Sequence, residues 1–180
     1  MNKKIFLVIA LLYLVNFLSN AQYIGNNYQD TKLSLKNLTA PASRVDLGIG
    51  AGFSFFNNKT GYAVGMFSEI KLESFSIVPQ ANYWKIDNIS NFEMAGLARI
   101  NFQTTSIKPY VDGGIGVNFY DDKDKKESFT KLGVDVGAGI NFEGIFEKNI
   151  IFVDGKYKII ISDTGNKYGY TLIFGIKFPL

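Results

Sequence analysis

Apolar residues recur at every second position from Val45 to the end of the chain, which is the period of a β-strand. In the first segment Val45, Leu47 and Ile49 share one face, while Asp46 and Gly48 share the other. The same alternation returns in segments that cover residues 45–55, 62–72, 75–83, 92–103, 110–119, 131–142, 151–161 and 168–178. The pattern therefore predicts eight amphipathic strands.

The connections between these segments are short and rich in Asn, Asp, Gly, Lys and Ser, which predicts an antiparallel meander. An even number of strands can close into a barrel, and segments of about eleven residues match the roughly 9 to 11 tilted residues that cross a bilayer. We therefore predict an all-β fold, an eight-stranded antiparallel up-and-down transmembrane β-barrel formed by residues 43–180. Pro79 lies inside the third segment, and because proline cannot donate to a ladder we expect a β-bulge there.

The N-terminal residues carry the three regions of a secretory signal peptide. Residues 1–4 include two lysines, residues 5–18 form a nearly unbroken apolar run, and small residues precede Gln22. The apolar run is shorter than the roughly 20 residues that a membrane-spanning helix needs. We expect residues 1–21 to be removed as a signal peptide. Residues 22–42 lack a complete strand pattern and are expected to form a periplasmic lead segment.

The face of each strand that points inward decides between two kinds of barrel. In a soluble barrel such as a lipocalin the apolar face lines the interior, whereas in a membrane barrel it faces lipid. The polar face of the segments carries acids and bases in equal number, as expected of an enclosed and paired network. We expect a lumen charge network made of Asp46, Glu69, Lys71, Arg99, Asp112, Lys131, Asp135, Asp154, Lys156 and Lys158.

Aromatic residues on the apolar face gather towards the ends of the segments, with smaller apolar residues between them. If strand direction alternates, one rim carries Phe55, Tyr62, Tyr83, Phe92, Phe119 and Tyr170. The other rim carries Phe75, Phe102, Phe142 and Phe178. Two such girdles are typical of the two interfaces of a membrane barrel, and a soluble core has no reason to sort its aromatic residues in this way.

An internal repeat supports the same architecture. Val45–Phe53 aligns with Val111–Phe119 and with Val134–Phe142, and the three copies share Val-Asp, alternating glycines and a closing Phe. The shared Asp and Gly fall on the polar face, where glycine leaves room for long partners such as Arg99 or Lys156. A glycine-rich phosphate loop would have to open a helix, and the sequence predicts none there.

Composition removes several chemistries. The 180 residues contain no Cys and no His, which excludes disulfides, thiolate nucleophiles and every histidine-based catalytic or metal site. Without residues 1–21 the chain has 17 basic and 16 acidic residues, so no polybasic patch favours nucleic acid. The lysines within the acidic run 121–127 oppose bound calcium, and this run is expected to be a solvated outer loop. We expect no catalytic residue, no cofactor and no metal.

These features resemble the small eight-stranded outer-membrane barrels of Gram-negative bacteria, of the OmpA transmembrane domain and OmpX type, over residues 43–180. Members of that group end in a strand that the barrel-assembly machinery recognises, with a glycine followed by apolar residues three and five positions later. Gly175, Phe178 and Leu180 fit that spacing, although Ile173 stands where a polar residue is usual and Leu180 replaces the common aromatic residue. The resemblance implies insertion by this machinery and lipid of the outer membrane as the surrounding partner.

The sequence leaves three functional hypotheses. The first is a non-enzymatic protein of the cell outer membrane with a structural or interaction role, whose lumen is filled by side chains as expected for eight strands. The second is a narrow porin-like channel for ions or small solutes, and the third is a secreted lipocalin-like barrel that binds an apolar ligand. The predicted outer loops are short by family standards, which argues against adhesion: 56–61, 86–91, 120–128 and 162–167.

Overall fold

The computed structural model describes residues 45–102, 107–146, 148–163 and 165–180. Every described residue belongs to one compact unit, Arg44–Leu180. The expected signal peptide and lead segment therefore lie outside the described residues. Within the described ranges no helix is long and apolar enough to cross a membrane.

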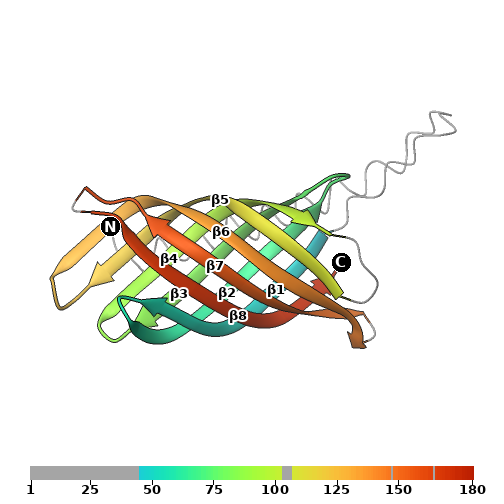
Figure 1. The fold of residues 1–180 in the computed structure, drawn as a ribbon, viewed down its shortest axis with the longest axis horizontal. Coiled ribbons are helices and arrows are strands. Elements are labelled where there is room, and N and C mark those ends of the chain that lie inside the picture. The colour runs from blue at the N-terminus through green and yellow to red at the C-terminus, as the bar shows by residue number, and fades with distance from the viewer. Residues whose placement is uncertain (1–44, 103–106, 147, 164) are drawn as a thin grey trace, which may run out of the picture. The chain divides into compact units, whose positions relative to one another are not determined.

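Eight antiparallel strands close into a barrel in sequence order, with β1 paired to both β2 and β8 (Figure 1). The predicted fold class is confirmed. The strands are β1 (Val45–Phe56), β2 (Lys59–Lys71), β3 (Ser76–Ile86), β4 (Ile89–Asn101), β5 (Ile107–Asp122), β6 (Glu127–Phe146), β7 (Asn149–Ile160) and β8 (Lys167–Pro179). We call the end with the β1–β2, β3–β4, β5–β6 and β7–β8 turns the hairpin end, and the opposite end, where β1 begins and β8 stops, the terminal end.

Two of the turns at the hairpin end are as tight as a β-hairpin allows. Phe56 pairs with Lys59 across the β1–β2 turn, so only Asn57 and Asn58 form the loop, and both have positive φ angles of 49° and 59°. A two-residue turn of this hand requires positive φ at both central positions, which asparagine tolerates better than most residues. The asparagine pair therefore fixes the register of the first hairpin.

Pro79 does not produce the expected β-bulge. The register between β2 and β3 is the same on both sides of it, from Phe67 opposite Gln80 to Ile70 opposite Ile77, and only the pairings in between are missing. On its other side Pro79 pairs in register with Gly96 of β4. The missing proline N–H therefore interrupts one ladder locally without inserting a residue. A register shift is found instead in β6, between Phe142 and Phe146.

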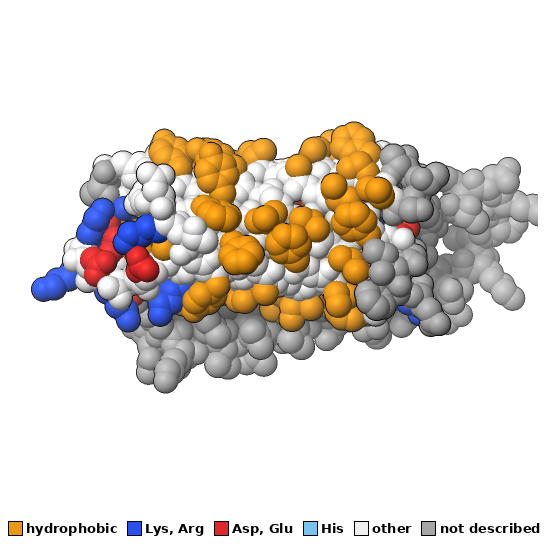
Figure 2. Space-filling view, turned by 60° about the horizontal axis from the view of Figure 1, so that its bottom comes forward, with side chains coloured by type: hydrophobic (Ala, Val, Ile, Leu, Met, Phe, Trp, Pro, Cys, Tyr) orange, Lys and Arg blue, Asp and Glu red, His pale blue; other side chains and the backbone are white. Residues whose placement is uncertain are grey.

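The apolar face of every strand points outward. Ile115 is 67% exposed on the barrel wall, whereas Asp112, three residues earlier on β5, is buried in the lumen. Figure 2 shows apolar side chains spread along the wall, with charged side chains gathered beyond them at the hairpin end. This arrangement suits an apolar surrounding, because soluble monomers rarely expose an apolar surface of this extent. It is the reverse of the lipocalin arrangement, in which apolar side chains line the interior.

Candidate functional site: the lumen and its two ends

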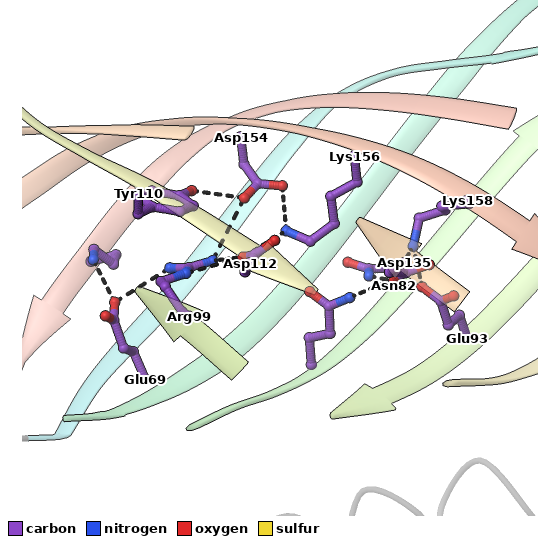
Figure 3. A network of polar contacts seen from close by, with 12 residues as sticks. Glu69, Asn82, Glu93, Arg99, Tyr110, Asp112, Asp135, Asp154, Lys156 and Lys158 are labelled. Carbon is purple, nitrogen blue, oxygen red and sulfur yellow. Dashed lines mark hydrogen bonds and ion pairs between the residues drawn. The ribbon is translucent and has the colours of Figure 1, made fainter. Parts of the chain in front are cut away.

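Arg99 of β4 forms the centre of the larger charged cluster in the lumen. Its Nη2 atom lies 2.6 Å from Asp112 Oδ2 on β5, and its Nη1 atom lies 3.3 Å from Glu69 Oε2 on β2. Nη2 is also 3.6 Å from Asp154 Oδ2 on β7, so one guanidinium faces carboxylates from three other strands (Figure 3). The hydroxyl of Tyr110 donates a hydrogen bond of 2.7 Å to Asp154 Oδ2.

Further lysines complete this cluster and balance its charge. Lys177 Nζ lies 2.7 Å from Glu69 Oε2, Lys71 Nζ lies 2.7 Å from Asp46 Oδ2, and Lys156 pairs with Asp154. The four carboxylates therefore face four cations. The members of this Arg99 cluster are Asp46, Glu69, Lys71, Arg99, Tyr110, Asp112, Asp154, Lys156 and Lys177. Buried charges are tolerable only when they are paired. Each charged member of the cluster forms an ion pair, and Oδ1 of Asp112 is a buried oxygen without a hydrogen-bond partner among the described residues.

A smaller charged cluster lies nearer the hairpin end and is built around Lys158 of β7. Lys158 Nζ contacts Glu93 Oε2 and lies 2.7 Å from Asp135 Oδ2. Two amides support these carboxylates: Gln80 Nε2 donates to Asp135 at 3.1 Å, and Asn82 Nδ2 donates to Glu93 at 3.2 Å. These five residues come from β3, β4, β6 and β7 and form the Lys158 cluster (Figure 3).

Apolar side chains also point into the lumen, which the alternation pattern did not predict. Along β3, the inward residues Trp84 and Ile86 at the hairpin end are apolar, Asn82 and Gln80 are polar, and Val78 is apolar again. The apolar group at the hairpin end, which we call the aromatic cap, consists of Phe56, Ala63, Trp84, Ile86, Tyr120 and Ile160, and Ile173 and Phe152 continue the same buried cluster towards the terminal end. A second apolar group packs beside Phe67 and contains Val78, Ala95 and Leu97. Apolar and charged layers therefore alternate along the lumen.

The structure brings nine of the ten predicted lumen charges into the two clusters. Lys131 is different: it pairs with Asp163 of the β7–β8 turn, whose side chain is 88% exposed, and not with a buried carboxylate. Two cluster members, Glu93 and Lys177, were missed among the predicted charges, although both fall on the polar face of their segments. The alternation of polar and apolar positions alone could have identified both residues as lumen charges.

The three residues of the proposed assembly signal lie on β8 or directly after it. Gly175 faces inward, and a Cβ atom there would lie 2.5 Å from the ring of Phe152. Phe178 points outward at the terminal end and is 41% exposed. Leu180 follows the strand, and its backbone N–H donates to the carbonyl oxygen of Val45 at 2.9 Å.

Side-chain contacts link the turns at the hairpin end to one another. Lys59 Nζ lies 2.8 Å from Asp87 Oδ2, which joins the first hairpin to the second and raises the pKa of Lys59 through this hydrogen bond. Asn88 Nδ2 then donates to Asp124 Oδ1 at 2.9 Å, which joins the second hairpin to the third. No cluster of acidic residues suited to a metal ion is found among the described residues, and the 121–127 run contributes to this linked rim instead.

The terminal end contains a polar cavity of about 280 Å³. Its wall includes Asn141 and two lysines of the Arg99 cluster, Lys71 and Lys177. It also includes an ion pair between Lys108 and Glu143, with 2.6 Å between Nζ and Oε2. Asn141 is buried, and its Oδ1 atom has no hydrogen-bond partner among the described residues. The Arg99 cluster lies between this cavity and the Lys158 cluster, so the cavity ends inside the barrel.

Comparisons with known proteins agree with this architecture. No protein-family model matches the chain, and no curated protein matches it. Among solved structures, Neisserial surface protein A is similar with a TM-score of 0.61 and 14% identity, covering 75% of this chain and 95% of that one. The N-terminal β-barrel domain of Pseudomonas aeruginosa OprF has a TM-score of 0.50 and 16% identity, covering 76% and 98%. The outer membrane enzyme PagL has a TM-score of 0.51 and 18% identity, covering 75% and 99%.

The chain therefore has the fold of the small eight-stranded outer-membrane β-barrels. The described strands span nearly the full length of each of these three structures. At these identities the similarity concerns the fold, and the function has to be argued from the lumen, the wall and the two ends.

Proposed function

We propose that this chain is a non-enzymatic protein of the cell outer membrane, with a structural or interaction role and a lumen closed by side chains. The single observation that carries the proposal is the combination of an outward apolar wall with a lumen filled by paired charges. The apolar wall suits lipid, and the two charged clusters and the apolar groups between and beyond them occupy the lumen. In this proposal residues 1–21 direct export, and the barrel-assembly machinery inserts residues 43–180.

The filled lumen favours a closed barrel over the narrow channel. A solute that entered the terminal cavity would meet the Arg99 cluster, then the layer around Val78 and Leu97, then the Lys158 cluster and finally the aromatic cap. Displacing any of the buried ion pairs would leave charges without partners at a cost of several kcal/mol. An eight-stranded barrel has an interior that side chains alone can fill.

The absence of histidine and cysteine from the sequence supports the non-enzymatic role. PagL shows that the same fold can carry an enzyme, so the fold by itself does not decide this point. The lumen carboxylates Glu69, Glu93 and Asp112 are engaged in the two clusters, where lysines and Arg99 neutralise them. A catalytic carboxylate would need access to substrate, which these buried positions do not offer.

Cell fractionation combined with heat-modifiable gel mobility tests the proposal. The expressed full chain should sediment with the outer membrane, require detergent for extraction and migrate differently before and after boiling. Intact mass of the extracted protein should correspond to a chain that begins at Gln22. Recovery of a soluble periplasmic monomer would contradict the membrane role and favour a ligand-binding soluble barrel.

A further inference from the structure

Two lysines form one side of the polar cavity at the terminal end. Lys71 Nζ lies 2.7 Å from Asp46 Oδ2 on β1. Lys177 Nζ, although the residue belongs to β8, lies 2.7 Å from Glu69 Oε2 on β2. Both ammonium groups are therefore held on the β1–β2 side of the lumen. An ammonium group has three donor hydrogens, more than a single ion pair uses, so this side of the cavity is suited to receive a carboxylate.

The opposite side of the cavity presents acceptors. In the closed order of eight strands, β5 and β6 lie opposite β1 and β2. Asn141 and Glu143 of β6 line the cavity there. Asn141 is only 4% exposed, and its Oδ1 atom has no hydrogen-bond partner among the described residues. Because a buried acceptor without a donor lowers stability, a donor that a ligand brings to this position would be strongly favoured.

The lysines that line the cavity are already balanced by carboxylates. Lys71 and Lys177 pair with Asp46 and Glu69, and Lys108 pairs with Glu143. An anion alone would therefore add a negative charge to a wall whose lysines have partners, and a cation alone would lie beside three ammonium groups. A zwitterion adds no net charge, and its two ends match the two sides of the cavity.

We propose that the terminal cavity binds a small zwitterion of the size of a dipeptide. Its carboxylate lies against Lys71 and Lys177, and its ammonium group donates to Asn141 Oδ1 with Glu143 beside it. The cavity of about 280 Å³ holds roughly nine water-sized groups at about 30 Å³ each, which is close to the size of dialanine. The Arg99 cluster closes the inner end of the site, so the site binds its ligand without conducting it. This inference rests on the closed lumen of the proposed function and deepens the interaction role by naming a ligand class.

Calorimetric titration of the full-length protein in phosphatidylcholine nanodiscs tests the chemistry of the ligand. Dialanine should bind at one site per barrel. N-acetyl-dialanine lacks the ammonium group and dialanine amide lacks the carboxylate, so each should bind at least about tenfold more weakly through the loss of a charge-assisted hydrogen bond. Equal affinity for all three compounds would overturn the inference, and so would the absence of dialanine binding.

Two variants of the acceptor side test the position of the ligand. Asn141→Leu keeps the size of the side chain and removes the buried acceptor, so the affinity for dialanine should fall at least about tenfold while the unfolding midpoint changes little. Glu143→Gln should also weaken binding, because it removes the negative charge beside the ammonium group. Asp163→Asn is the matched control, since it removes a carboxylate from a lysine ion pair at the hairpin end. It should bind dialanine as the wild type does.

The outcomes separate this inference from the proposed function. Equal losses of affinity in Glu143→Gln and Asp163→Asn would overturn the placement of the ligand at the terminal end. An inserted barrel that is silent in planar bilayers and binds no dialanine would overturn this inference alone. Steady conductance of the wild type would contradict the closed lumen on which both proposals rest.

Discussion

The guanidinium of Arg99 stacks on the ring of Tyr110, with Cζ 3.8 Å from the ring centroid, while its Nη2 atom is 2.6 Å from Asp112. The stacked ring covers one face of the cation, and the carboxylates surround its edge. Water is thereby excluded from a charge that is 1% exposed. Such an arrangement strengthens the ion pairs, so the loss of one partner strongly lowers the stability of the folded barrel.

Arg99→Ala should therefore lower the free energy of unfolding by about 3 to 5 kcal/mol, because Asp112 and Asp154 lose a buried cationic partner. Urea unfolding in lipid vesicles measures this loss. The control Lys131→Ala breaks an ion pair at the hairpin end and should cost only about 0 to 1 kcal/mol. Similar small losses for both variants would mean that water solvates the Arg99 cluster.

Val117 and Asn118 of β5 test the assignment of the two faces. Val117→Arg should cost about 2 to 4 kcal/mol, because the position faces outward near the middle of the wall. Asn118→Ser should cost about 1 kcal/mol through the loss of the 2.8 Å hydrogen bond from Asn91. Refolding and urea titration in the same vesicles compare the two variants, and equal mild effects would contradict the outward position of Val117.

Gly52 of β1 should resist substitution because of the β8 backbone beside it. A Cβ atom at Gly52 would lie 1.9 Å from the carbonyl oxygen of Leu172, so Gly52→Ala should separate the two strands that close the barrel and cost about 1 to 3 kcal/mol or more. At Gly96 nothing lies within 4 Å of the added atom, and Gly96→Ala should be neutral or stabilising by about 0.4 to 1 kcal/mol. The test compares the unfolding midpoints of the Gly52→Ala and Gly96→Ala variants. Equal midpoints would contradict the close approach of the β1 and β8 backbones.

The wild-type protein should show no steady single-channel conductance in planar bilayers. The aromatic cap closes the hairpin end, and both charged clusters fill the lumen beneath it. Trp84→Ala removes the largest ring of the cap and should also remain silent, because the two clusters stay in place. A porin recorded in the same bilayer serves as the positive control. Steady conductance of the wild type would contradict the closed lumen and support the channel hypothesis.

The number of strands and the faces of their side chains could be predicted from the sequence. A period of two places every second residue on one side of a strand, so residues as far apart as Asp46 and Asp154 could be assigned to the lumen before any contact was known. The sequence also predicted short polar connections, although the expected loop 56–61 is in fact a two-residue turn formed by Asn57 and Asn58. The effect of Pro79 could not be predicted from the sequence. The missing backbone N–H of proline has only a local effect, and the neighbouring strands keep their register around it.

The sequence by itself determined which residues face the lumen, because alternation acts on each strand separately. Only the tertiary structure decided which of them meet, because barrel closure and strand stagger bring together residues with no sequence relationship. Lys177 reaches Glu69, 108 positions earlier, and Lys131 reaches Asp163 at the hairpin end instead of the buried clusters. The apolar layers of the lumen have the same origin: residues such as Trp84 and Leu97 are apolar at inward positions of their strands, and only their neighbours across the lumen make them a core.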